Sequence, residues 1–101
     1  MRVLYVDDLR NPTEWKALGW QVEIARNYNQ AINALRANKY DANDLDHDLG
    51  EDETGYDVVI YMLENQISVE TFMLHTMNPV GRYNMEQLIK HYYPESKIMI
   101  Y

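Results

Sequence analysis

The sequence predicts a three-layer α/β fold built on a five-stranded parallel sheet with helices on both faces. Five short apolar runs alternate with four stretches of helical periodicity, in the order βαβαβαβαβ. Short connections between strictly alternating elements favour parallel strands joined by right-handed crossovers. No helical pattern follows the last run, so we expect the final helix to be missing and one face of the sheet to be thinly covered. At 101 residues the chain is expected to form one domain, 1–101.

The first strand and helix are marked by an apolar run and by a helix-start pattern. Residues 2–6, RVLYV, lack polar alternation, which is typical of a strand covered on both faces. The Asn-Pro pair at 11–12 predicts the start of a short helix, because proline is favoured at the first helical position. In that helix Trp15 and Leu18 are expected to face inward, and Gly19 to end it.

The next elements follow from periodicity and capping. Residues 20–25 alternate apolar and polar side chains and predict a strand with one solvent-exposed face. Asn27 and Gln30 have the spacing of a capping box and predict a helix to about residue 38. Residues 40–46, YDANDLD, are a weaker strand candidate.

The second half contains two helices and two strands. We expect a helix over 54–66, a strand over 69–76, a helix over 83–92 and a strand over 97–101. The buried stripe of the second of these helices is predicted to carry Met85, Leu88, Ile89 and Tyr92.

The acidic composition limits the classes of partner. Lys and Arg number 9 against 16 Asp and Glu, a formal net charge of −7. Duplex-DNA affinity depends largely on basic side chains, so the composition argues against a duplex-DNA binder, whereas a small phosphorylated ligand needs only a local positive group. The chain has no cysteine, which excludes disulfides and thiolate chemistry. Without a membrane-length apolar run or signal-peptide pattern, we expect a cytoplasmic protein with no membrane partner, of undetermined oligomeric state.

Polar side chains gather where three predicted strands end. In an open parallel sheet, ligands bind at the carboxyl ends of the strands, so these side chains are expected to meet at one edge. The candidates after the first, third and fourth strands are Asp7, Asp8, Arg10, Asp46, His47, Asp48, His75, Thr76, Asn78, Gly81, Arg82 and Asn84.

Other polar residues have simpler explanations. The acids at 51–53 in the loop DLGEDET are expected to be solvated, because consecutive charges usually face water. His91 is late in a helix, where an imidazolium suits the helix dipole, and we interpret it as structural.

Two sets of motifs carry a resemblance to known families. The acid pair Asp7-Asp8, Asp46 and the helix opening TGYD resemble response-regulator receiver domains, which have a flavodoxin-like fold. The blocks LDHDLGEDETGYD and HTMNPVGRYNM, with the opening VDDLRNPTEW, more closely resemble the cyclic-phosphate processing receiver-like family. This resemblance covers nearly the whole chain. It departs at Asn43-Asp44, where the strand before LDHDLG is usually apolar, and it lacks the lysine that receivers carry after the fifth strand.

The resemblance implies a phosphoesterase that acts on a cyclic phosphate of a nucleotide or RNA end. Imidazoles titrate near neutral pH, so His47 and His75 are predicted to share the acid and base roles, supported by Asp46 and Asp48. The predicted substrate-binding residues are Arg10, Thr76, Asn78, Gly81, Arg82 and Asn84.

The predicted metal ligands are Asp7, Asp8 and Asp46, for Mg²⁺ or Mn²⁺, because four clustered acids would otherwise repel a phosphate. Metal-free catalysis by two histidines remains the other possibility. A module that binds or sequesters a cyclic nucleotide or a protein partner without turnover is the alternative function. A signalling receiver is disfavoured by the missing lysine and the additional histidine.

Overall fold

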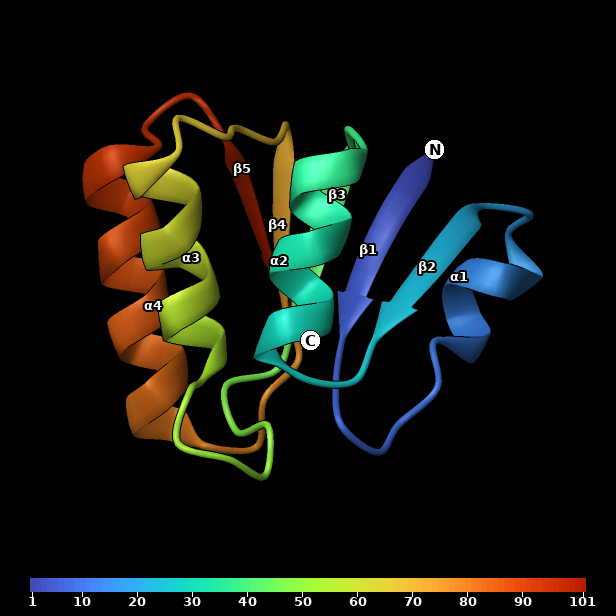
Figure 1. Ribbon diagram of the computed structural model, residues 1–101, viewed down its shortest axis with the longest axis horizontal. Helices are drawn as coiled ribbons and strands as arrows, with labels where there is room; N and C mark the ends of the chain where they lie inside the picture. The colour runs from blue at the N-terminus through green and yellow to red at the C-terminus, as the bar shows by residue number, and fades with distance from the viewer.

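The computed structural model describes all 101 residues and contains one parallel sheet. Its strand order is β2-β1-β3-β4-β5, so the order reverses at β1 and β3 (Figure 1). The strands are β1 (Arg2–Val6), β2 (Gln21–Ala25), β3 (Ala42–Leu45), β4 (Thr71–Leu74) and β5 (Lys97–Ile100). The predicted receiver-like fold with five parallel strands is confirmed.

Four helices cover the sheet unequally. They are α1 (Thr13–Ala17), α2 (Tyr28–Ala37), α3 (Gly55–Glu64) and α4 (Pro79–Tyr92). Helices α2, α3 and α4 lie together on one face, and the short α1 lies at the other side beside β2 (Figure 1). No helix follows β5 within these residues, as predicted, which leaves the α1 face thinly covered.

The main hydrophobic core lies between the sheet and α2, α3 and α4. Its fully buried members from the strands include Leu4, Val6, Leu45, Phe72 and Leu74, and those from the helices include Val58, Val59, Met62, Met85 and Ile89. On the α1 face a smaller cluster joins Val3, Ala42 and Met73, covered by Trp15, Trp20 and Val22. The Trp15 and Trp20 rings stack with centroids 4.8 Å apart, so indole surface replaces part of the missing helical layer.

Three details of the helix predictions were wrong. Helix α4 begins at Pro79, four residues before the predicted start, because the Asn78 side chain accepts a hydrogen bond from Gly81 N–H and caps it. Leu18 is 61% exposed and does not face inward, since α1 ends one residue earlier. Tyr92 is 57% exposed, whereas Met85, Leu88 and Ile89 are buried as predicted.

Asn43 and Asp44, the polar residues that made 40–46 a weaker strand candidate, are both fully buried in β3. Asn43 pairs in register with Leu4 and Phe72, and its amide donates a hydrogen bond to Met62 Sδ (3.2 Å) on the main-core side. Asp44 lies one residue further along the strand and therefore faces the α1 side. Strand β3 therefore carries a buried polar side chain on each face: Asn43 toward the main core and Asp44 toward α1.

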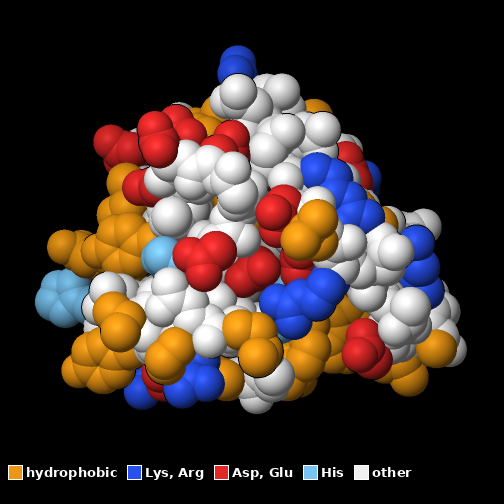
Figure 2. Space-filling model, turned by 90° about the horizontal axis from the view of Figure 1, so that it is seen from below, with side chains coloured by type: hydrophobic (Ala, Val, Ile, Leu, Met, Phe, Trp, Pro, Cys, Tyr) orange, Lys and Arg blue, Asp and Glu red, His pale blue; other side chains and the backbone are white.

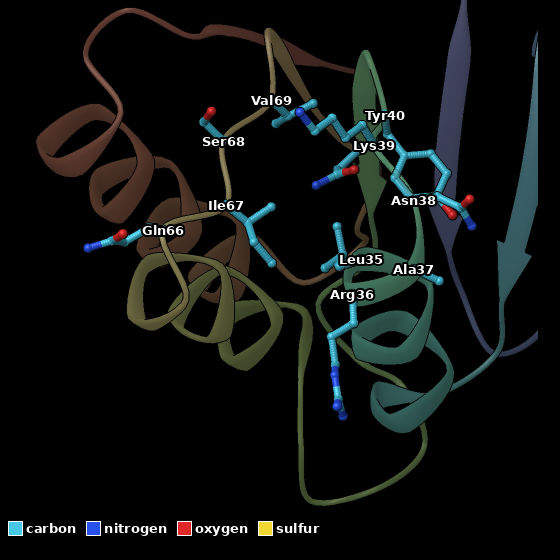
Figure 3. Close-up of a pocket in the computed structure, with 11 residues that line it drawn as sticks. Leu35, Arg36, Ala37, Asn38, Lys39, Tyr40, Gln66, Ile67, Ser68 and Val69 are labelled. Carbon is cyan, nitrogen blue, oxygen red and sulfur yellow. The ribbon is translucent and has the colours of Figure 1, made fainter.

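Asn43 also lines a cavity of about 490 Å³ at the amino edge of the sheet, far from the carboxyl edge. The C-terminal end of α2 and the segment 66–69 form its walls (Figure 3). None of the predicted site residues lines it. Asn43 Oδ1 is buried without a hydrogen-bond partner.

None of the helices combines the length and hydrophobicity that a membrane crossing requires.

We predict that Asn43→Leu, a change of similar shape, raises the free energy of unfolding by about 1 kcal/mol. A buried carbonyl without a partner costs free energy that an apolar group does not. Urea unfolding monitored by tryptophan fluorescence measures the change. A loss of stability would contradict the prediction and would mean that Asn43 Oδ1 is satisfied in solution.

Candidate functional site

The carboxyl ends of the strands form an acidic pocket of about 520 Å³. Acidic side chains gather at the centre of this edge, beside a basic side chain and a histidine (Figure 2). The acidic pocket is lined by Asp7, Asp8, Leu9, Arg10, Asp46, Asp48, Gly50, Thr76 and Met77. Six of these lining residues were predicted from the sequence, so the expected meeting of strand ends is confirmed.

Asp7 is held firmly at the end of β1. Its Oδ1 accepts the backbone N–H groups of Leu9 (2.8 Å) and Arg10 (2.9 Å). The Arg10 guanidinium pairs with Asp7 Oδ2 (3.1 Å) and Asp46 Oδ2 (3.4 Å) and donates to the His75 carbonyl (2.9 Å). Arg10 therefore links the ends of three neighbouring strands and neutralises part of the acidic charge.

His75 lies beneath the pocket and is only 4% exposed. Its Nδ1 lies 2.5 Å from Asp44 Oδ1, and its Nε2 lies 2.9 Å from Asp7 Oδ2. The Tyr5 ring stacks on the imidazole at 4.6 Å with an interplanar angle of 5°. Asp44 also accepts hydrogen bonds from Trp15 Nε1 (2.6 Å) and from the Tyr101 hydroxyl. We call Asp44, His75 and Asp7 the buried triad.

The pKa values of His75 and Asp7 are shifted in the directions that favour their charged forms. Burial works to lower the pKa of His75, but hydrogen bonds and charges from Asp44 and Asp7 outweigh it and raise that pKa. Burial works to raise the pKa of Asp7, but hydrogen bonds from Arg10 N–H, Leu9 N–H and His75 outweigh it and lower that pKa. Each ring nitrogen of His75 also faces a carboxylate oxygen, which as an ionised group only accepts hydrogen bonds, so the geometry is that of a doubly protonated ring.

This geometry does not support the acid–base role that the sequence predicted for His75. Neither ring nitrogen is free to exchange a proton with a substrate, and the ring is covered by Tyr5. Asp44 was not among the predicted site residues, although it bonds His75. The signal was available, because Asp44 precedes Asp46 by two residues in a strand, a spacing that places both on the same face.

His47 is the accessible histidine of the predicted pair. Its Nδ1 lies 3.0 Å from Asp48 Oδ1, and its side chain is 18% exposed. This hydrogen bond lowers the pKa of Asp48, although burial opposes the effect. Nε2 of His47 makes no hydrogen bond within the protein. His47 can therefore exchange a proton with a bound molecule through Nε2 while Asp48 orients the ring.

A second hollow, the α3–α4 groove, begins at His47 and has a volume of about 750 Å³. It is lined by His47, Thr54, Tyr56, Asn84, Gln87, Leu88 and His91. The structure thus divides the predicted site: the acids, Arg10 and Thr76 line the acidic pocket, and His47 and Asn84 line the groove. His91, which we interpreted as structural, is a groove residue.

Two glycines of the motifs are required by close approach. A Cβ atom at Gly81 would lie 2.4 Å from His47 Cγ, so the absence of a side chain there makes room for the imidazole. A Cβ atom at Gly55 would lie 2.0 Å from the Asp46 carbonyl oxygen, so this glycine lets α3 begin against the end of β3. Gly81 therefore contributes to the site by positioning His47.

The remaining predicted residues of the fourth strand end have mainly local roles. Thr76 Oγ1 accepts the Asn78 N–H (3.1 Å), and the Asn78 amide caps α4 and donates to Asp48 Oδ1 (3.4 Å). Arg82 is exposed and lines neither hollow. Residues 51–53 are exposed as predicted.

The acidic pocket contains donors that fit a hard divalent cation only in part. Ligand atoms of Asp7, Asp46 and His75 lie within 4.8 Å of one another. A doubly protonated imidazole has no lone pair for a metal, so His75 does not fit. The carboxylate oxygens of Asp7, Asp8 and Asp46 suit Mg²⁺, with Arg10 as a competing cation on two of them.

The doubly wound sheet and the acids at its switch point define a receiver-like domain. Residues 2–91 match the model of the cyclic-phosphate processing receiver domain, and the chain belongs to this family. No curated protein matches the chain.

Solved structures with the same fold are response-regulator receiver proteins. The chain is similar to TrrA of Thermotoga maritima in complex with Mg²⁺-BeF, at 18% identity and a TM-score of 0.72, over 99% of this chain and 85% of that one. It is similar to the non-phosphorylated HemR receiver domain of Leptospira biflexa, at 23% identity and a TM-score of 0.71, over 98% and 80%. At these identities the likeness concerns the fold.

We predict that the buried triad makes stability fall as pH rises. The pKa of His75 in the folded state is raised above its usual 6.5, so its stabilisation is complete below that value and is lost as pH rises toward the folded pKa. The steepest expected decrease is about 1.4 kcal/mol per pH unit. Urea unfolding between pH 6 and pH 9 measures it, with His91→Gln as a control that removes an exposed histidine and keeps the slope. A flat profile would show that His75 is neutral.

We predict that Gly81→Ala displaces the His47 ring without unfolding the protein. The added methyl group overlaps the ring, whereas alanine in place of glycine favours the helix by up to about 1 kcal/mol. The imidazole NMR signals of His47 should shift while the melting temperature stays near that of the wild type. Tyr83→Ala, an exposed change on the same helix, should leave those signals in place. Unshifted His47 signals in the glycine variant would contradict the close contact.

Proposed function

We propose that this domain is a phosphoesterase that opens a cyclic phosphate of a nucleotide or RNA end, with His47 as its acid–base group. The observation that carries the proposal is that His47 lines the α3–α4 groove with Nε2 free, while its Nδ1 is bonded to Asp48, which lines the acidic pocket. The family match to a cyclic-phosphate processing domain agrees with it.

In the proposed reaction one histidine serves first as the base and then as the acid. His47 Nε2 takes a proton from water while the water oxygen bonds to phosphorus. It then returns this proton to the ester oxygen while the bond between phosphorus and that ester oxygen breaks. Asp48 orients the ring and stabilises the intermediate imidazolium. In this scheme His75 is a positioning residue, because its positive charge holds Asp7 and Asp44 in place from below.

The acidic pocket requires positive charge before a phosphate can approach. Asp7, Asp8, Asp46 and Asp48 surround it, and only Arg10 lies among them as a permanent cation. We propose that Asp8, Asp46 and Asp7 hold Mg²⁺ or Mn²⁺ there, which would supply charge neutralisation and polarisation of the phosphoryl group. Arg10 would then move toward the phosphate oxygens, which suit its guanidinium geometry.

A binding module is the second candidate function. The observation that favours it is the burial of His75, which leaves one accessible histidine where the sequence predicted two. Such a module would hold a cyclic phosphate at the same edge without releasing product.

We predict that the protein hydrolyses 2′,3′-cyclic nucleotides and that His47→Gln lowers kcat by about 100-fold or more, since general acid–base catalysis contributes 10²–10⁴-fold. Turnover is measured with Mg²⁺, with Mn²⁺ and with EDTA, and the EDTA reaction should be the slowest. Lys90→Gln, an exposed change on α4 outside both hollows, is the control. Turnover unaffected by His47→Gln would refute the proposed mechanism, and tight binding without turnover would establish the binding module.

A further inference from the structure

The α3–α4 groove differs chemically from the acidic pocket beside it. None of its seven lining residues is acidic, although the chain carries 16 acidic residues. It has a histidine from the loop after β3 and another near the C-terminal end of α4. On the face in Figure 2, the pale blue histidine side chains have hydrophobic surface and no acidic surface between them. A polyanion is repelled less by this groove than by the rest of the edge.

The groove follows one face of α4 for about two turns. Asn84, Gln87, Leu88 and His91 are spaced three, one and three residues apart, which places them on one side of the helix. His47 packs against Gly81 of α4, and His91 lies ten residues further along the same helix. The two histidines therefore reach the groove at points about 15 Å apart along the helix axis. A cyclic mononucleotide has one phosphate and cannot place an anion at both.

The lining side chains suit nucleosides. Tyr56 is a half-buried aromatic ring on which a base can stack. Asn84 and Gln87 are exposed amides that can both donate to and accept from a base edge. The His91 ring is oriented by an edge contact with Tyr92 at 4.5 Å, and as an imidazolium it would hold a phosphate.

We propose that the α3–α4 groove binds the nucleotides that precede a terminal cyclic phosphate, so that the substrate is an RNA end rather than a free cyclic mononucleotide. A terminal 2′,3′-cyclic phosphate requires the ribose 2′-hydroxyl, which makes the strand RNA. This inference rests on the proposed function in placing the cyclic phosphate at His47. Tyr56 and Gln87 then contact a preceding base, and His91 a phosphate further back along the strand.

The test compares a cyclic 2′,3′-mononucleotide with an RNA trinucleotide that ends in the same group. The wild type should have a kcat/KM at least about tenfold higher for the trinucleotide, since stacking of one base alone contributes that much. His91→Gln and Gln87→Ala should each remove most of this preference. Lys90→Gln, which removes a full charge one residue from His91 but outside the groove, should keep it.

A second measurement separates this inference from the proposed function. The wild-type protein is titrated with an RNA trinucleotide ending in a plain 3′-phosphate, and the ring NMR signals of His91 and Tyr56 are followed. Shifts in both, reduced by Gln87→Ala, support the groove even if no cyclic substrate is turned over. Turnover of both substrates at equal rates with unshifted His91 signals overturns the groove and leaves the phosphoesterase standing. Neither turnover nor shifts overturns both.

Discussion

The buried triad of Asp44, His75 and Asp7 is the interaction on which the carboxyl edge of the sheet depends. It joins β3, β4 and β1 through charged groups that are almost completely removed from water. Desolvation of each ion costs several kcal/mol, so the arrangement is stable only because every partner is present. Trp15 and Tyr101 complete the hydrogen bonds of Asp44 from the thinly covered α1 face. The same contacts therefore close the core and fix the ends of the three strands.

The buried triad also determines which groups remain for chemistry. Because both ring nitrogens of His75 are bonded to carboxylates below the surface, His47, in the loop after β3, is the histidine of the pair that is left accessible for proton exchange. That loop is placed by two close contacts, of Gly55 with the Asp46 carbonyl and of Gly81 with the His47 ring. Some motif residues that the sequence suggests as ligand-binding therefore have a structural role: they position the backbone or a neighbouring side chain. Asn78 is a further case, since its amide caps α4 and reaches Asp48.

The fold could be predicted from the sequence because each strand and helix has its own local pattern. Hydrophobic alternation and capping residues set these elements, and parallel topology brings Asp7, Asp46 and His47 to one edge. The burial of His75 could not be predicted in the same way, because it depends on the hydrogen bond to Asp44. Only the pairing of β3 with β1 and β4 brings Asp44 next to the His75 ring. Helix α4 was predicted too short because its local start signal, the Asn78 cap followed by Pro79, was overlooked. Local pattern identifies the edge, whereas long-range contacts decide the role of each group on it.

The acidic pocket and the α3–α4 groove differ in the charge of their lining residues, and this difference constrains how a ligand can approach. The acidic pocket repels an incoming phosphate unless a cation is present, whereas the α3–α4 groove has no acidic lining residue. A polyanionic chain that arrived across the acids would meet repulsion along its whole length. A chain that lies along α4 exposes only its last phosphate to them. The end of the chain is then the one part that reaches His47, so the electrostatics favour a ligand recognised at its terminus.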